Sequence, residues 1–114
     1  PGAFADADML VAGGTGLSVS EAAAQAALWA VWASPMLLSA DMSQVPGWAK
    51  ELLQNGELLA VQGDWAASRG DGRGAESFAR CLPPCPRAAD GGVQRWHRRL
   101  SGGRHALALL NSAT

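Results

Sequence analysis

The sequence lacks several features that would select a class of partner. Its 114 residues carry nine basic and ten acidic side chains, for a formal net charge of −1. No overall field therefore attracts nucleic acid or an anionic membrane. The sequence also has no run of 18 or more apolar residues, the length that a membrane-spanning helix needs. We expect neither a nucleic-acid partner nor a membrane partner.

Cysteine is scarce as well. Only Cys81 and Cys85 are present, too few for a disulfide framework, and two cysteines alone do not fix the compartment. The chain begins at Pro1 without the charged and apolar regions of a signal peptide. We expect a modest domain or, more specifically, a piece of a longer protein.

The residues that are present divide the chain into three parts. Residues 1–62 are apolar and regularly patterned. Residues 63–92 are interrupted by Gly, Pro and Arg and show no sustained period, which indicates an irregular linker or insertion. Residues 93–114 predict two short strands around a turn.

The clearest helix signal begins at Ser18. Ser18 and Glu21 fit the capping box S-x-x-E, in which each side chain accepts a backbone N–H at the helix start. The alanine-rich residues that follow favour helix up to about Ala33, and Pro35 ends it. The predicted buried face comprises Leu28, Val31 and Trp32.

Strand and helix signals alternate after this point. Residues 36–41, "MLLSAD", predict a buried strand. A second helix is expected from Gly47 to Gln54, with Gly56 as its terminator. The order of strand, helix, strand and helix favours an α/β fold with a parallel sheet.

Aspartates stand where such a sheet presents functional groups. In (β/α)8 barrels these groups lie just past the C-terminal ends of the strands, and the sequence places Asp8 and Asp41 there. The plainer alternative is that Asp6, Asp8 and Asp41 only cap the next loop or helix.

A set of ordered phrases favours the functional alternative. The phrases are "PGAFADADMLVAGG", "GLSVSE", "ALWA", "SPMLLSAD", "LLQNGELLAVQGD" and "WHRRLSGGRHALALLN". Together they resemble the α-galactosidases and α-N-acetylgalactosaminidases of glycoside hydrolase family 27, the melibiases. The chain departs from the family pattern at Phe4, Ala5, Ala7, Gln62, Gly63 and Arg99.

The resemblance implies a fold and an activity. Residues 1–62 would form the last two βα units of a (β/α)8 TIM barrel, and residues 93–114 would form the first hairpin of an antiparallel β-sandwich domain. The whole protein would be a retaining glycosidase that releases terminal α-linked galactose. Such enzymes use two carboxyl groups about 5 Å apart, and in this family both precede the present segment.

The resemblance also implies site residues and surroundings. Asp8 and Met9 match positions that line the galactose pocket, and Asp6 and Phe4 are expected to support that pocket. Asp41 matches a structural position. No catalytic residue, metal or cofactor is expected within the segment. The family implies a secreted, lysosomal or vacuolar protein and allows a homodimer; the alternative function is an inactive carbohydrate-binding relative or a non-functional gene fragment.

A zinc site is one alternative role for the cysteines and histidines. Cys81, Cys85, His97 and His105 are ordered like a Cys2His2 site, but the spacing C-x3-C, 11 residues, H-x7-H does not fit a zinc finger. A disulfide between the two cysteines is the favoured alternative, since a secreted or lysosomal setting permits it.

The expected pairing of the hairpin strands indicates whether His97 and His105 could bind the same zinc ion. A two-residue turn at positions 101 and 102 puts Trp96 opposite Leu107, with Leu109 on the same buried face. That register points His97 and His105 to opposite faces, whereas a three-residue loop would reverse this conclusion.

The basic side chains of the hairpin and the tryptophans are expected to have structural roles. The basic side chains at positions 95, 98, 99 and 104 predict an exposed edge strand, with single-stranded nucleic acid as the weaker alternative. We expect Trp29, Trp32 and Trp48 to be core residues, and Trp65 is the one loop aromatic that could stack on a sugar.

Overall fold

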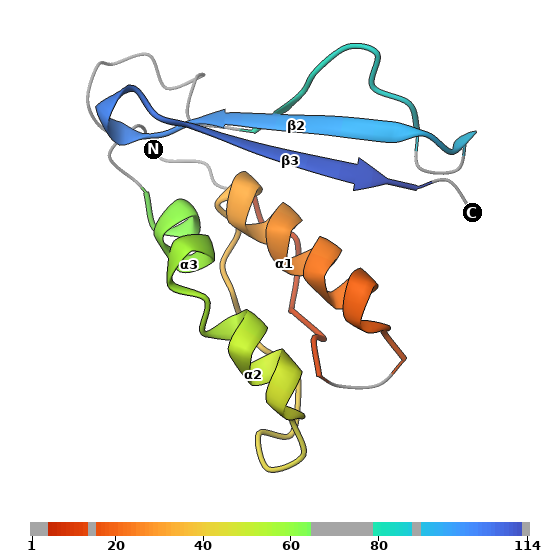
Figure 1. Ribbon diagram of the computed structural model, residues 1–114, viewed down its shortest axis with the longest axis vertical. Helices are drawn as coiled ribbons and strands as arrows, with labels where there is room; N and C mark the ends of the chain where they lie inside the picture. Colours follow the sequence, from red (N-terminus) through yellow and green to blue (C-terminus); the bar gives the residue numbers. More distant parts are fainter. Residues whose placement is uncertain (1–4, 14–15, 65–78, 88–89, 113–114) are drawn as a thin grey trace.

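The computed structural model describes residues 5–13, 16–64, 79–87 and 90–112. Three helices lie on one side of a three-stranded antiparallel sheet (Figure 1). Within these residues, no helix combines the length and the apolar character needed to cross a membrane. The helices are α1 (Val19–Trp32), α2 (Gly47–Leu53) and α3 (Gly56–Gln62), and the strands are β1 (Arg80–Cys81), β2 (Val93–Arg99) and β3 (His105–Asn111).

Helix α1 begins as its sequence predicts. The Ser18 side chain accepts from the Glu21 amide, and the Glu21 carboxylate accepts from the Ser18 amide, which completes the capping box. At the other end Ala33 adopts a left-handed conformation, with φ of 56°. Of the predicted buried residues Leu28, Val31 and Trp32 only Val31 is fully buried, because small alanine side chains form the rest of the face that packs against neighbouring segments. The buried members of this face are Ala22, Ala26, Ala30 and Val31.

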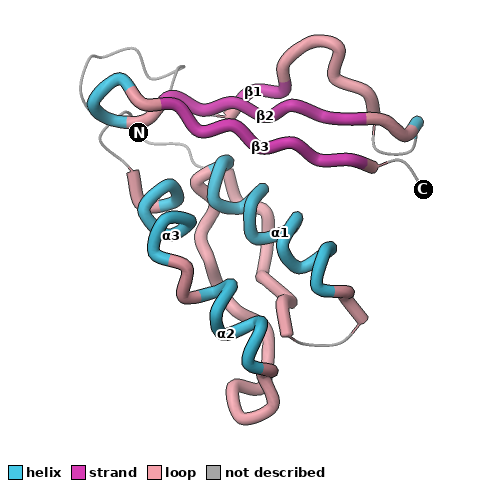
Figure 2. Tube along the Cα trace, viewed as in Figure 1, coloured by secondary structure: helices cyan, strands magenta, loops and turns pink. Residues whose placement is uncertain are grey.

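The segments on either side of α1 meet in parallel. Leu10 and Leu38 form a parallel bridge, in which the Leu10 amide donates to Leu37 O and its carbonyl accepts from Ser39 N, both at 2.7 Å. Leu10 is 1% exposed. The predicted parallel pairing across a helix is therefore present, although as a single bridge within longer loop segments (Figure 2).

Gly56 has a different role from the predicted one. It begins α3 instead of terminating α2, which ends at Leu53 with Gln54 as its C-cap. The reason is Asn55, whose Oδ1 accepts from the amides of Glu57 and Leu58 and so starts a new helix. An Asn-Gly pair after a helix is equally compatible with the end of that helix and with the start of the next one, because Gly favours C-termini and Asn favours N-caps.

Gly13 occupies a position where a side chain does not fit. Its φ is +79°, and an added Cβ would lie 2.9 Å from the Cβ of Ala49 and 3.0 Å from Cγ1 of Val45. We expect Gly13→Ala to lower the free energy of unfolding by about 1–3 kcal/mol through overpacking and backbone strain. Gly16→Ala is the matched control, because Gly16 also has a positive φ, +93°, but has no atom within 4 Å of the added Cβ. Denaturant unfolding of the two variants measures the difference, and equal losses would show that the close packing at Gly13 contributes nothing.

The turn of the β2–β3 hairpin has three residues inside the hydrogen-bonded pair of Leu100 and Arg104, which corrects the predicted register. Trp96 lies opposite Ala108 and His97 opposite Leu107, with a 3-10 turn, η2 (Ser101–Gly103), between the strands. Gly102 and Gly103 have φ of 65° and 73°, and their freedom in the left-handed region allows the extra residue.

The corrected register changes which side chains are buried. Leu107 and Leu109 are 61% and 66% exposed, so the prediction that they share a buried face with Trp96 is wrong. Trp96 instead faces the helices and meets Trp32 edge-on, with ring centroids 5.1 Å apart. Trp29, Trp32 and Trp48 are all partly buried.

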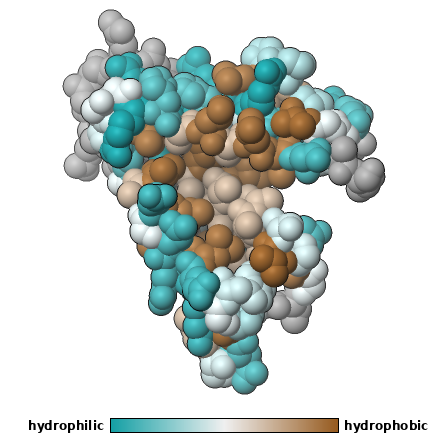
Figure 3. Space-filling view, viewed as in Figure 1, coloured by the Kyte–Doolittle hydropathy of each residue, from teal (hydrophilic) through white to brown (hydrophobic). Residues whose placement is uncertain are grey.

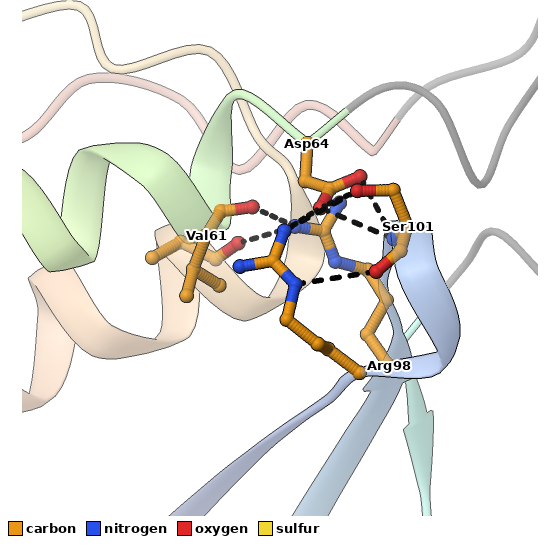
Figure 4. A network of polar contacts seen from close by, with 6 residues as sticks. Val61, Asp64, Arg98 and Ser101 are labelled. Atoms are coloured by element: carbon orange, nitrogen blue, oxygen red, sulfur yellow. Dashed lines mark hydrogen bonds and ion pairs between the residues drawn. The ribbon is translucent and has the colours of Figure 1, made fainter.

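Arg98 departs most from expectation. The sequence predicts an exposed side chain, yet Arg98 is 2% exposed and lies between β2 and the helices (Figure 4). Its guanidinium donates to the carbonyl oxygens of Val61 and Ala30, near the C-terminal ends of α3 and α1. Neither helix has a basic residue in its own last turn, so Arg98 supplies the cation that two helix C-termini favour.

Asp64 fixes the turn of the same hairpin. Its carboxylate accepts from the amide and hydroxyl of Ser101 and forms an ion pair of 3.0 Å with Arg104. Burial alone would raise the pKa of the Asp64 carboxyl. The hydrogen bonds from Ser101 and the charges of Arg104 and Arg98 outweigh burial and hold the pKa below its ordinary value. Burial lowers the pKa of Arg98, against the opposing charge of Asp64.

Candidate functional site

A short loop, residues 6–9, carries the side chains expected to hold a sugar. The Asp8 amide donates to Oδ1 of Asp6 at 3.0 Å, and the Met9 amide donates to Oδ1 of Asp8 at 2.8 Å. Asp8 has a φ of 68°, a conformation that aspartate tolerates better than most residues. Asp6 and Asp8 are exposed, and Met9 is 49% exposed. The loop thus presents a carboxylate and a thioether side by side to solvent.

Side chains from three other segments hold this loop in place. The Trp29 indole N–H donates to the Asp8 carbonyl at 2.8 Å. The Ser34 hydroxyl, fully buried, accepts from the Ala7 amide at 2.9 Å. Gln62 in turn donates to the Ser34 carbonyl. The loop conformation is therefore fixed by α1, the segment after it and α3.

These supporting residues were only partly foreseen. Trp29 was expected to be simply a core residue, and the motif "ALWA" that contains it was the available signal for a second role. Ser34 lies in the phrase "SPMLLSAD" and Gln62 departs from the family pattern, but neither fact predicts a contact with this loop, because hydrogen bonds over 27 or 28 positions leave no periodic trace in the sequence.

Asp8 comes before, not after, the residue of its segment that pairs with the neighbouring segment. The bridge is formed by Leu10, so Asp8 precedes it by two positions, and the expectation that Asp8 stands just past a strand end is corrected. The positive φ of Asp8 turns the chain there, and extended pairing can begin only after that turn.

Asp41 has a local partner that explains its presence. Its Oδ1 accepts from both the hydroxyl and the amide of Ser43, at 2.8 and 2.9 Å. These hydrogen bonds, the one from the hydroxyl foremost, lower the pKa of the Asp41 carboxyl. The carboxylate thereby closes a turn on its own segment, an arrangement typical of a structural aspartate.

The remaining predicted residues fall into three groups. Phe4 and Trp65 lie outside the described residues. Cys81 and Cys85 form a disulfide with a Cα–Cα distance of 5.8 Å. His97 and His105 lie on one face with Nε2 and Nδ1 2.7 Å apart, so the predicted opposite orientation is wrong. Among the residues that the structure describes, no group of three or more His, Cys, Asp or Glu side chains could hold a metal ion.

A hollow lies between the sheet and the helices. It has a volume of about 450 Å³ and runs along Ala106–Leu109 between α1 and α3. Apolar surface surrounds it in the space-filling view (Figure 3). Among the described residues that line it, Glu57 is the one with a titratable side chain, and Asn55 lines it as well. A largely apolar groove with one carboxylate offers no chemistry comparable to that of the loop at residues 6–9.

The exposed side chains of residues 6–9 offer hydrogen-bond acceptors beside an apolar group, a combination that suits a polyhydroxylated ligand. An ionised carboxylate accepts up to four hydrogen bonds, and the hydrogen bonds to hydroxyl donors are strengthened by its charge. The Met9 side chain beside it is apolar and adaptable, so it suits the carbon face of a sugar ring.

Comparison with known proteins identifies the family. The family model described as Alpha galactosidase A, of the melibiase group, matches residues 1–64. Human α-galactosidase A is 34% identical over 112 residues, which cover 97% of this chain and 23% of that protein. Chicken α-N-acetylgalactosaminidase is 36% identical over 87 residues, covering 72% of this chain and 22% of that protein.

A solved structure agrees at the level of the fold. The structure of an α-galactosidase from Saccharomyces cerevisiae with raffinose has a TM-score of 0.70 at 22% identity, and the match covers 95% of this chain and 23% of that one. The present chain thus spans about a quarter of the length of the relatives it matches. It belongs to the α-galactosidase A family, the melibiases of glycoside hydrolase family 27.

Proposed function

We propose that the whole protein is a retaining α-galactosidase that removes terminal α-linked galactose from oligosaccharides or glycoconjugates. Residues 1–62 would supply the last two βα units of its (β/α)8 barrel, and residues 93–114 would begin its antiparallel β-sandwich domain. The segment 63–92 connects them. The parallel bridge of Leu10 and Leu38 across α1 supports the first assignment, and the antiparallel β2–β3 hairpin supports the second.

The arrangement of Asp8 and Met9 carries the proposal for the site. Both side chains are exposed, although the backbone that bears them is held by Trp29 and Asp6. A fixed backbone that presents an exposed carboxylate is what sugar recognition needs, because preorganisation lowers the entropy lost on binding. Asp6 has the supporting role, since its Oδ1 receives the Asp8 amide.

The two catalytic carboxyl groups would lie outside this chain. Within this chain, Asp8 would accept hydrogen bonds from sugar hydroxyls and place negative charge close to the reacting carbon, where a retaining mechanism develops positive charge. Nearby like charge also raises the pKa of a neighbouring carboxyl, so Asp8 would help keep a general acid protonated.

The Cys81–Cys85 disulfide supports an oxidising compartment for the protein. Disulfides persist in secreted and lumenal proteins and are rare where cytosolic thiols are kept reduced. We therefore propose a secreted, lysosomal or vacuolar location.

An inactive carbohydrate-binding relative is the second candidate. Ala5 and Ala7 stand where the family resemblance has Asn and Pro, and these changes flank Asp6 directly. The described loop nevertheless has the hydrogen bonds from the Asp8 and Met9 amides to the aspartate side chains, and Ala7 adds a bond to Ser34 that proline could not donate. This observation favours the active enzyme.

Hydrolysis by the whole protein separates the two candidates. We expect release of p-nitrophenol from p-nitrophenyl α-D-galactoside, with the matched α-N-acetylgalactosaminide as the comparison substrate. Binding of galactose without hydrolysis of either substrate would favour the inactive relative. Neither binding nor hydrolysis by the folded protein would contradict both.

A further inference from the structure

The peptide group between Asp8 and Met9 takes part in two hydrogen bonds at once. Its carbonyl oxygen accepts from the indole Nε1–H of Trp29 at 2.8 Å, and its N–H donates to Oδ1 of Asp8, also at 2.8 Å. A peptide group is planar and rigid. The direction of the carbonyl therefore sets the direction of the N–H, and the N–H in turn sets the direction of the Asp8 carboxylate.

Asp8 does not favour this orientation by itself. Its φ of 68° lies in the left-handed region, which a residue other than glycine adopts only at some cost. The hydrogen bonds with Asp6 and with the Met9 amide are both internal to the loop. Among the described residues, the bond from Trp29 is the one that ties the Asp8 backbone to another element, across 21 positions of sequence. Without this bond the peptide could turn and relieve the cost at Asp8.

We infer that Trp29 is a positioning residue for the sugar site: its indole N–H holds the Asp8–Met9 peptide so that the Asp8 carboxylate faces the sugar. The inference rests on the proposed function, in which Asp8 accepts hydrogen bonds from sugar hydroxyls. Trp29 acts through Asp8 and needs no contact with the sugar. A carboxylate that is already oriented loses less freedom on binding, and its charge is directed at the reacting carbon before the reaction begins.

Trp32, three positions further along α1, provides a matched comparison. Its indole Nε1 is buried and has no hydrogen-bond partner among the described residues. The rings of Trp29 and Trp32 contact each other with centroids 5.8 Å apart, so Trp29→Phe and Trp32→Phe remove the same bulk and weaken the same contact. Trp29→Phe also removes the hydrogen bond to the Asp8 carbonyl. A difference in activity between the two variants therefore reports on that bond.

Steady-state kinetics of the whole protein on p-nitrophenyl α-D-galactoside test the inference. We expect Trp29→Phe to lower kcat/KM about fivefold, the usual effect of one hydrogen bond, and Trp32→Phe to stay within about twofold of wild type. In an Asp8→Asn background the carboxylate charge is already absent, so Trp29→Phe should lower kcat/KM by less than about twofold further. A purely structural role of Trp29 would give the same loss in both backgrounds.

A crystal structure of the Trp29→Phe variant of the whole protein, without ligand, provides a readout that does not depend on activity. We expect the Asp8–Met9 peptide to turn from its wild-type direction or to occupy several orientations. An unchanged peptide, or equal losses of kcat/KM for Trp29→Phe and Trp32→Phe, would overturn the inference. A wild type that neither binds galactose nor hydrolyses the substrate would instead contradict the proposed function on which the inference rests.

Discussion

Replacing Asp8 by Asn in the whole protein should lower kcat/KM for an α-galactoside by about 100-fold, equivalent to about 2.7 kcal/mol of transition-state stabilisation. Asn keeps the size of the side chain and can still accept from the Met9 amide through its carbonyl oxygen. It loses the negative charge that makes hydrogen bonds from sugar hydroxyls strong. The loss should therefore appear in steady-state kinetics and leave the folded structure intact.

Asp41→Asn is the matched control for this change. Asp41 is an exposed aspartate whose carboxylate is occupied by Ser43, so we expect its kcat/KM to remain within about threefold of wild type, as for a change outside the pocket. Circular dichroism and thermal melting establish that both variants are folded. If Asp8→Asn and Asp41→Asn had the same kcat/KM as wild type, Asp8 would be only a loop residue.

Loss of Arg98 should produce the largest change in stability. Arg98→Ala removes the guanidinium that donates to Val61 and Ala30, and it leaves a cavity between the sheet and the helices. Unpaired buried carbonyls and lost packing together predict a decrease of about 3–5 kcal/mol in the free energy of unfolding. Denaturant unfolding of the whole protein, monitored by tryptophan fluorescence, measures it, since Trp96 of the same strand meets Trp32 of α1.

Arg104→Ala serves as the comparison for Arg98→Ala. The side chain of Arg104 is 65% exposed although it pairs with Asp64, and an exposed ion pair contributes about 1 kcal/mol or less. Arg98→Lys adds a second comparison, because it keeps the charge but not the planar fork of donors. A loss for Arg98→Ala no greater than that for Arg104→Ala would show that the buried contacts do not hold the hairpin to the helices.

Local signals in the sequence predicted the elements well. The capping box at Ser18 and Glu21 located the start of α1, and the apolar segments around Leu10 and Leu38 predicted a parallel pairing that the structure contains. Both depend on interactions between near neighbours or on simple apolar patterns. The ordered phrases placed the chain in its family, which composition and periodicity alone could not do.

Register and burial were harder to predict, for physical reasons. One extra turn residue at Gly103 reverses which side chains share a face, and neither a two- nor a three-residue loop was excluded by the residues present. Arg98 looks like any exposed arginine of a basic strand, because its partners are backbone carbonyls of Val61 and Ala30 that leave no mark in the sequence. The same holds for the loop at Asp8, whose conformation depends on Ser34 and Trp29.

The most direct test of the central claim is a crystal structure of the whole protein with bound galactose. The account predicts that a carboxylate oxygen of Asp8 lies within about 3.0 Å of a sugar hydroxyl oxygen, the limit for a well-formed O–H···O hydrogen bond, with the Met9 side chain against the ring. Galactose bound elsewhere, with Asp8 out of hydrogen-bonding distance and its carboxylate turned to solvent, would contradict it.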